Sequence, residues 1–140
     1  MEQGKTIDQL NIGDKASLTK QITESDVLRF AEVTGDKNPI HIDPEYARQT
    51  RFGERIAHGM LTASLISAVL GSHFPGPGNI YVSQSLAFKA PVKLGDVIEA
   101  EVEIIEKIPE RNRVRLRTVC RNQDGTVVID GEAVVLPRRD

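Results

Sequence analysis

The sequence has little that would tie it to an oxidising compartment, to nucleic acid or to a membrane. Its single cysteine, Cys120, excludes an internal disulfide, which suits the reducing cytosol. The formal net charge of −2 offers no excess of basic residues, whereas nucleic-acid-binding surfaces are basic. The longest apolar run, over residues 59–70, is too short to span a bilayer, and residues 1–11 lack a signal-peptide pattern. We therefore expect a cytoplasmic protein that binds neither nucleic acid nor membrane.

The length and composition favour one folded domain. At 140 residues the chain is long enough for a hydrophobic core of its own, so we expect a single domain over residues 1–140. Hydrophobic residues make up 39% of the chain and charged residues 27%, which is ordinary for a soluble protein. No internal repeat, low-complexity tract or long linker divides it.

Three helices are predicted in the first half of the chain. Residues 23–26, Thr-Glu-Ser-Asp, form a capping-box pattern that opens a helix, and Gly35 ends it. Asp43-Pro44 starts a short helix that should run to about Thr50. The third helix, over about residues 59–71, is apolar or small on nearly every side, which indicates a buried helix.

About five segments have the pattern of β-strands: residues 15–22, 79–90, 97–107, 111–121 and 126–136. The third segment alternates glutamates with apolar residues, and the fourth alternates arginines with apolar residues. If these two strands pair antiparallel, opposite charges meet on the outer face, an interpretation we favour over a phosphate-binding patch. Antiparallel sheets commonly have one solvated face, so the buried helix should cover the other. The sequence therefore predicts an α+β arrangement in which a sheet wraps around a central helix.

An acid and an imidazole lie five residues apart in Gly35-Asp36-Lys37-Asn38-Pro39-Ile40-His41. Pro39 lacks a backbone N–H and disfavours a helical conformation at Asn38, so the segment cannot be one continuous helix. Asp36 and His41 should therefore lie at the two ends of a bent loop, where their side chains can converge as a general acid/base pair. The alternative interpretation is an ordinary turn in which Asp36 and Asn38 bond to the local backbone.

A second segment follows, Phe52-Gly53-Glu54-Arg55-Ile56-Ala57-His58-Gly59-Met60. Together the two segments resemble the MaoC-like family of (R)-specific enoyl-CoA hydratases, which carries Asp-x-Asn-Pro-x-His and then Phe…Ile-Ala-His-Gly-Met. The resemblance continues through residues 80–89, Pro91-Val92 and Gly95-Asp96, and so covers nearly the whole chain. It implies the hotdog fold, an acyl-CoA thioester substrate, no cofactor, and a homodimer or higher homo-oligomer joined at sheet edges.

The resemblance also implies the reaction and the site. Water adds to C3 of a trans-2-enoyl thioester and a proton adds to C2, which gives an (R)-3-hydroxyacyl thioester. Asp36 would be the principal base, and His41 would orient the water and protonate C2. The N–H of Gly59, free at a helix start, would bind the thioester oxyanion, unless the glycine only relieves crowding there. Ser67 would support Asp36, although a serine bonded to its own backbone is the alternative.

The remaining candidate residues are expected to be structural. Asn38 should shape the loop, His58 should pack and hydrogen-bond, and Cys120 should lie in the core. The three histidines lack ligand-type spacing, so no metal site is predicted.

Three other functions share the same fold. A 3-hydroxyacyl-thioester dehydratase of fatty-acid synthesis would use the same residues in reverse on an acyl carrier. A thioesterase of this fold commonly carries its carboxylate on the central helix, but residues 60–70 contain no Asp or Glu. A non-catalytic acyl-CoA-binding domain would not need the pair of Asp36 and His41.

Overall fold

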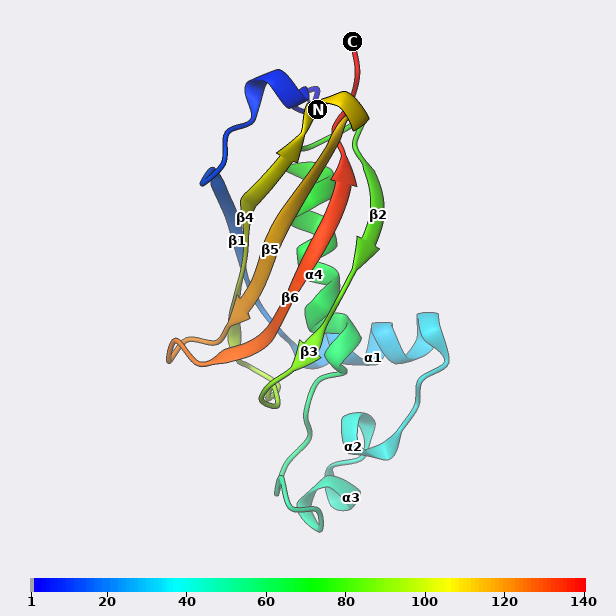
Figure 1. Cartoon of the computed structure of the whole chain (residues 1–140). Helices are drawn as coiled ribbons and strands as arrows, with labels where there is room; N and C mark the ends of the chain where they lie inside the picture. Colours follow the sequence, from blue (N-terminus) through cyan, green and yellow to red (C-terminus); the bar gives the residue numbers. More distant parts are fainter. Residues whose placement is uncertain (1) are drawn as a thin grey trace.

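A computed structural model describes residues 2–140 (Figure 1). Its elements in chain order are η1 (Ile7–Gln9), β1 (Lys15–Gln21), α1 (Glu24–Thr34), α2 (Pro39–Ile42), α3 (Pro44–Arg48), α4 (Gly59–Ser72), β2 (Ile80–Gln84), β3 (Ala87–Phe88), β4 (Val97–Ile108), η2 (Pro109–Arg111), β5 (Arg113–Arg121) and β6 (Val127–Leu136). None of the helices in this part of the chain is long and apolar enough to cross a membrane.

The strands form one antiparallel sheet in the order β1-β4-β5-β6-β2, and β3 pairs with β6. The helix α4 packs against β1, β4 and β5, and Figure 1 shows it lying along one face of the curved sheet. Its buried side chains, Ile66, Val69 and Leu70 among them, share the core with Val102 and Leu116 from the strands. This is the predicted α+β hotdog fold, with six strands instead of about five.

The sixth strand arises because residues 79–90 are interrupted at Ser85. The N–H of Ser85 donates to the carbonyl oxygen of Glu132, and the N–H of Glu132 donates to the Ser85 hydroxyl at 3.0 Å. Gly131 allows this approach, because a Cβ atom at position 131 would lie 1.9 Å from the Ser85 carbonyl oxygen. The Ser85 hydroxyl therefore takes the place of a backbone carbonyl oxygen as the acceptor for β6. The strand β2 ends just before Ser85, and β3 begins at Ala87.

The predicted charge pairing on the outer face of the sheet is confirmed. Glu99 lies opposite Arg121 in the register of β4 and β5. On the same two strands Arg115 forms ion pairs with Glu106 at 3.4 Å and with Glu132 of β6 at 2.8 Å. These arginines are bonded to carboxylates and do not form a separate phosphate-binding patch.

One face of α4 remains exposed, which differs from the prediction of burial on nearly every side. The exposed residues are mostly small: Gly59, Met60, Ser64, Ser67, Ala68, Gly71 and Ser72. The edge strand β2 also exposes large apolar side chains, Ile80, Tyr81 and Val82. In residues 2–140 of a single chain, nothing covers this face of the helix.

Candidate active site

The segment that carries Asp36 and His41 is bent by its local sequence. The helix α1 ends at Gly35, whose φ of 80° is left-handed and suits glycine. Asn38 is non-helical, with φ −54° and ψ 125°, and its side-chain oxygen accepts the N–H of Ile40. Asn38 thereby caps α2, in which Pro39 is the first residue. The predicted bend and the shaping role of Asn38 match the structure, but His41 lies in a short helix and not in a loop.

This segment lines a cavity of about 540 Å³, which falls in the size range of small-molecule sites. The other walls come from the loop over residues 51–58, the start of α4, residues 88–92, and Val128 and Ile129 of β6. Figure 1 shows α1, α2 and α3 at the end of the sheet where β3 lies. The lining is largely apolar, with Ile56, Phe88 and Val92 among its residues. Asp36 and His41 line the same cavity, so an apolar ligand bound there would contact both a carboxylate and an imidazole.

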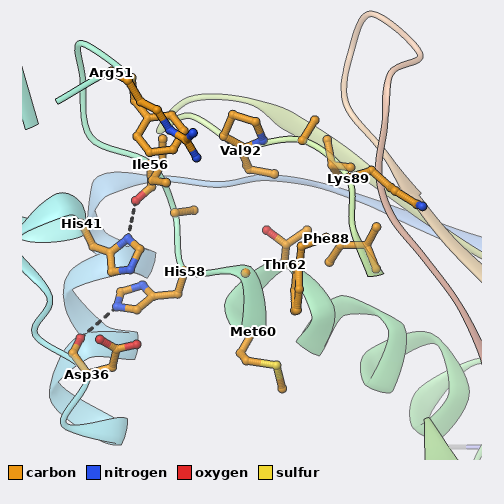
Figure 2. Close-up of a pocket in the computed structure, with 17 residues that line it drawn as sticks. Asp36, His41, Arg51, Ile56, His58, Met60, Thr62, Phe88, Lys89 and Val92 are labelled. Carbon is orange, nitrogen blue, oxygen red and sulfur yellow. Dashed lines mark hydrogen bonds between the residues drawn. The ribbon is translucent and has the colours of Figure 1, made fainter. Parts of the chain in front are cut away.

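The side chains of Asp36 and His41 converge, as the bent segment predicted. A carboxylate oxygen of Asp36 and one ring nitrogen from each of His41 and His58 lie within 4.8 Å of one another (Figure 2). Asp36 is exposed, whereas both histidines are buried. The acid therefore stays in contact with water while the imidazoles are fixed by packing.

His41 is a neutral hydrogen-bond acceptor near pH 7. Its Nδ1 lies 2.7 Å from the carbonyl oxygen of Ile56, which can only accept, so Nδ1 carries the proton and Nε2 has a free lone pair. Burial is the largest influence and lowers the pKa of His41 below its ordinary value of 6.5. The Ile56 hydrogen bond and the charge of Asp36 raise this pKa, while His58 lowers it further. The net lowering keeps the imidazole uncharged.

His58 supports both ends of this segment. Its Nε2–H donates to the backbone carbonyl oxygen of Asp36 at 3.0 Å, and its ring stacks on His41 with 3.9 Å between centroids. The ring of Phe30 tilts against it at 4.8 Å, and the imidazole is only 2% exposed. The structural role predicted for His58 is confirmed by this packing. The sequence did not predict that His58 would contact Asp36 and His41, although its place beside Gly59 in the second motif was the available signal.

The cluster of Asp36, His41 and His58 is poorly arranged for a metal ion. A histidine binds zinc along the in-plane lone pair of one nitrogen, at about 2.0–2.1 Å. Here the two rings are stacked with only 28° between their planes, and each has one nitrogen bonded to a carbonyl oxygen. In-plane lone pairs of two stacked rings are poorly placed to meet at one ion. The geometry therefore suits proton transfer better than ion binding.

Gly59 is the first residue of α4, where backbone N–H groups lack partners within the helix. A Cβ atom at this position would lie 2.6 Å from the ring of Phe88, so the glycine also relieves crowding. Both interpretations of this glycine, as an oxyanion donor and as relief of crowding, are therefore compatible with the structure.

Ser67 is an exposed residue of α4 and does not line the cavity. Its predicted support of Asp36 therefore remains a prediction.

Thr62 and Cys120 are both buried, and only the burial of Cys120 was predicted from the sequence. Thr62, which no pattern had singled out, is buried and lines the cavity. Cys120 is buried in β5, and burial raises the pKa of its thiol to about 12, so it is a core residue, as predicted, and a poor nucleophile.

Comparison with known proteins agrees with this geometry. A family model described as a MaoC like domain matches residues 9–124. The 3-hydroxybutyryl-CoA dehydratase of Methylorubrum extorquens is 53% identical, over 95% of this chain and 85% of that protein. The (R)-specific enoyl-CoA hydratase of Rhodospirillum rubrum is also 53% identical, over 89% of this chain and 85% of that protein. The solved structure of the R-hydratase PhaJ1 from Pseudomonas aeruginosa has a TM-score of 0.94 at 48% identity, and the match covers 98% and 88% of the two chains.

Proposed function

Because this chain belongs to the MaoC-like domain family, we propose that it is a hydro-lyase that reversibly hydrates a trans-2-enoyl-CoA to an (R)-3-hydroxyacyl-CoA. The observation that carries this proposal is the convergence of Asp36 and His41 at an apolar cavity. The names of the relatives support the same reaction class, since a hydratase and a dehydratase run one equilibrium in opposite directions. No nucleotide or metal takes part in the proposed reaction.

In the proposed mechanism, Asp36 and His41 hold one water molecule. The carboxylate of Asp36 accepts one of its hydrogens and Nε2 of His41 accepts the other, because Nδ1 already donates to Ile56. As the water oxygen bonds to C3, Asp36 takes up one of the two water protons. His41 relays this proton, which is then delivered to C2, and the other hydrogen stays on the new hydroxyl group. The enzyme ends as it began, and the substrate has gained H and OH.

The tautomer of His41 refines the predicted roles. Neutral His41 has no proton on Nε2, so it can protonate C2 only after it has accepted a proton from the water or from Asp36. We therefore keep Asp36 as the principal base, with His41 orienting the water and relaying the proton. Ser67 would act only as a distant support of Asp36.

The thioester oxygen gains negative charge when water bonds to C3. We propose that the N–H of Gly59 donates to this oxygen, since Gly59 begins α4 and lines the same cavity as the acid and the imidazole. The positive end of the α4 dipole adds to the stabilisation. In other enzymes the loss of one such donor costs about 3 kcal/mol of transition-state stabilisation.

Two basic residues support a substrate that carries phosphates. Arg51 and Lys89 are exposed and line the cavity, and neither forms an ion pair with any of residues 2–140. The guanidinium of Arg51 lies 4.9 Å from the ring centroid of Phe52, which steadies it beside the cavity. In an acyl-CoA complex the apolar lining would contact the acyl chain, and the two cations would bind the phosphates of the CoA.

The chain should hydrate crotonyl-CoA or a longer trans-2-enoyl-CoA. Loss of the enoyl thioester absorbance measures the reaction, and a chelator should leave the rate unchanged. An (S)-specific 3-hydroxyacyl-CoA dehydrogenase should form little NADH with the product. Retained absorbance across short and medium chains would contradict the proposal, and much faster turnover of the same enoyl group on an acyl carrier protein would favour the dehydratase of fatty-acid synthesis.

We also propose that the chain forms at least a homodimer. The edge strand β2 exposes Ile80, Tyr81 and Val82, and open edges and apolar faces are commonly covered by a second copy. Light scattering should give at least twice the chain mass of 15.4 kDa at micromolar concentration. Val82→Arg should weaken the assembly, whereas Val33→Arg, on the exposed side of α1, should not. A stable wild-type monomer would exclude the dimer.

A further inference from the structure

Thr62 has a buried hydroxyl without a protein partner. The residue is 1% exposed and lines the cavity, and its Oγ1 makes no hydrogen bond with any of residues 2–140. Nδ1 of His58 also lacks a partner in this part of the chain, and the two atoms do not bond to each other. Since buried polar groups are nearly always hydrogen-bonded, an unpaired hydroxyl in a cavity wall points to a ligand atom.

The usual local partner of a helical threonine is not used here. Threonine hydroxyls in helices commonly bond to the carbonyl oxygen three or four residues earlier. Ser64, on the same helix, does so with the carbonyl oxygen of Leu61. The Thr62 hydroxyl bonds to no carbonyl oxygen of residues 2–140, and that of His58, four residues earlier, accepts only the backbone N–H groups of Leu61 and Thr62. The hydroxyl is thus left without a partner in a residue of the cavity wall.

The position of Thr62 on α4 places it near the proposed oxyanion donor. Side chains on a helix tilt toward its N-terminus, so Thr62 reaches back over the turn that begins at Gly59. Figure 2 shows Thr62 between His58 and Phe88. A carbonyl oxygen at the N–H of Gly59 would therefore be close to this hydroxyl.

We propose, on the basis of the proposed function, that the Thr62 hydroxyl donates a second hydrogen bond to the thioester carbonyl oxygen, beside the N–H of Gly59. As water bonds to C3, the electrons of the C2–C3 double bond move toward this oxygen. When the proton reaches C2, the carbonyl double bond forms again. The Thr62 proton stays on its own oxygen throughout, so Thr62 stabilises charge and transfers nothing.

Thr62→Val replaces the hydroxyl by a methyl group of similar shape. It should lower kcat for crotonyl-CoA by about a hundredfold, with a smaller change in KM, because the donor is needed most in the transition state. Thr62→Ser should retain most of the activity. The thermal midpoint of the valine variant should not fall, since the wild-type hydroxyl bonds to no protein group.

Thr118→Val is the matched control. Thr118 is also fully buried, but its hydroxyl accepts a hydrogen bond from Nε2 of Gln84 at 2.8 Å. Its replacement should lower the thermal midpoint by several degrees and leave kcat unchanged. The two valine variants should therefore show opposite patterns of activity and stability.

Infrared spectra of bound butyryl-CoA with a ¹³C carbonyl test the contact itself, because this saturated thioester cannot be hydrated. The carbonyl stretch should lie at a higher frequency in Thr62→Val than in the wild type. Unchanged kcat with an unchanged frequency would overturn the inference, and so would lost activity with a lowered thermal midpoint and an unchanged frequency. If the wild type hydrates no enoyl-CoA, the proposed function fails, while the carbonyl frequency still decides whether Thr62 bonds to the thioester.

Discussion

Asp36→Asn should lower kcat for crotonyl-CoA hydration by about a hundredfold or more, the usual scale of general acid–base catalysis. The amide keeps the shape of the side chain and can still accept the N–H of Asn38, which bonds to Oδ1 at 3.3 Å in the wild type. What it loses is the charge that accepts a proton from water. The fold should therefore survive, and steady-state kinetics with a circular dichroism spectrum would separate the two effects.

Asp43→Asn provides the control for this change. Asp43 caps α3 by accepting the N–H groups of Glu45 and Tyr46, and asparagine caps helices equally well. Its kcat should stay near that of the wild type. His41→Gln should lose as much activity as Asp36→Asn, and the double variant should be little worse than the worse single one, because residues that act as a unit are not additive. Near-normal turnover in both folded single variants would show that Asp36 and His41 are structural.

His58→Ala should destabilise the fold by about 2–4 kcal/mol and also slow turnover. The change leaves a cavity beside Phe30 and His41 and removes the hydrogen bond to the backbone of Asp36. Turnover should fall because Asp36 and His41 lose the ring that positions both of them. Urea unfolding with an unchanged slope would give the stability difference directly.

His73→Ala is the matched control for this second prediction. His73 is exposed at the end of α4, and its replacement should change stability by no more than about 0.5 kcal/mol. His58→Gln, which keeps a side-chain N–H donor, should fall between the alanine variant and the wild type. If His58→Ala were as stable and as active as the wild type, the stacked ring would have no supporting role.

The features predicted well from the sequence are those that depend on neighbouring residues. Gly35 ends α1, Asp43 caps α3, and Pro39 prevents a continuous helix, because each acts within a few residues of itself. The charge pairing of Glu99 with Arg121 also followed from local alternation, once the two strands were taken as antiparallel.

The features that the sequence did not reveal depend on contacts between distant segments. The stacking of His41 on His58 joins α2 to the residue before α4, and no periodicity encodes it. The break at Ser85 depends on Gly131, which lies 46 positions away. A threonine within an apolar run, such as Thr62, gives no sign in the sequence of whether its hydroxyl finds a partner.

The close crossing of Gly131 and Ser85 has a consequence for genetic screens. Any side chain at position 131 would collide with the Ser85 carbonyl oxygen and push β3 away from β6. Phe88 is paired with Ile129 of β6, Lys89 comes next in the chain, and both line the cavity. A screen for lost enzyme activity would therefore rank Gly131 beside Asp36 and His41, although Gly131 does not line the cavity. A parallel measurement of protein abundance would separate the two kinds of position. Abundance should fall when Gly131 is replaced, because the fold needs it, and should stay normal when Asp36 or His41 is replaced.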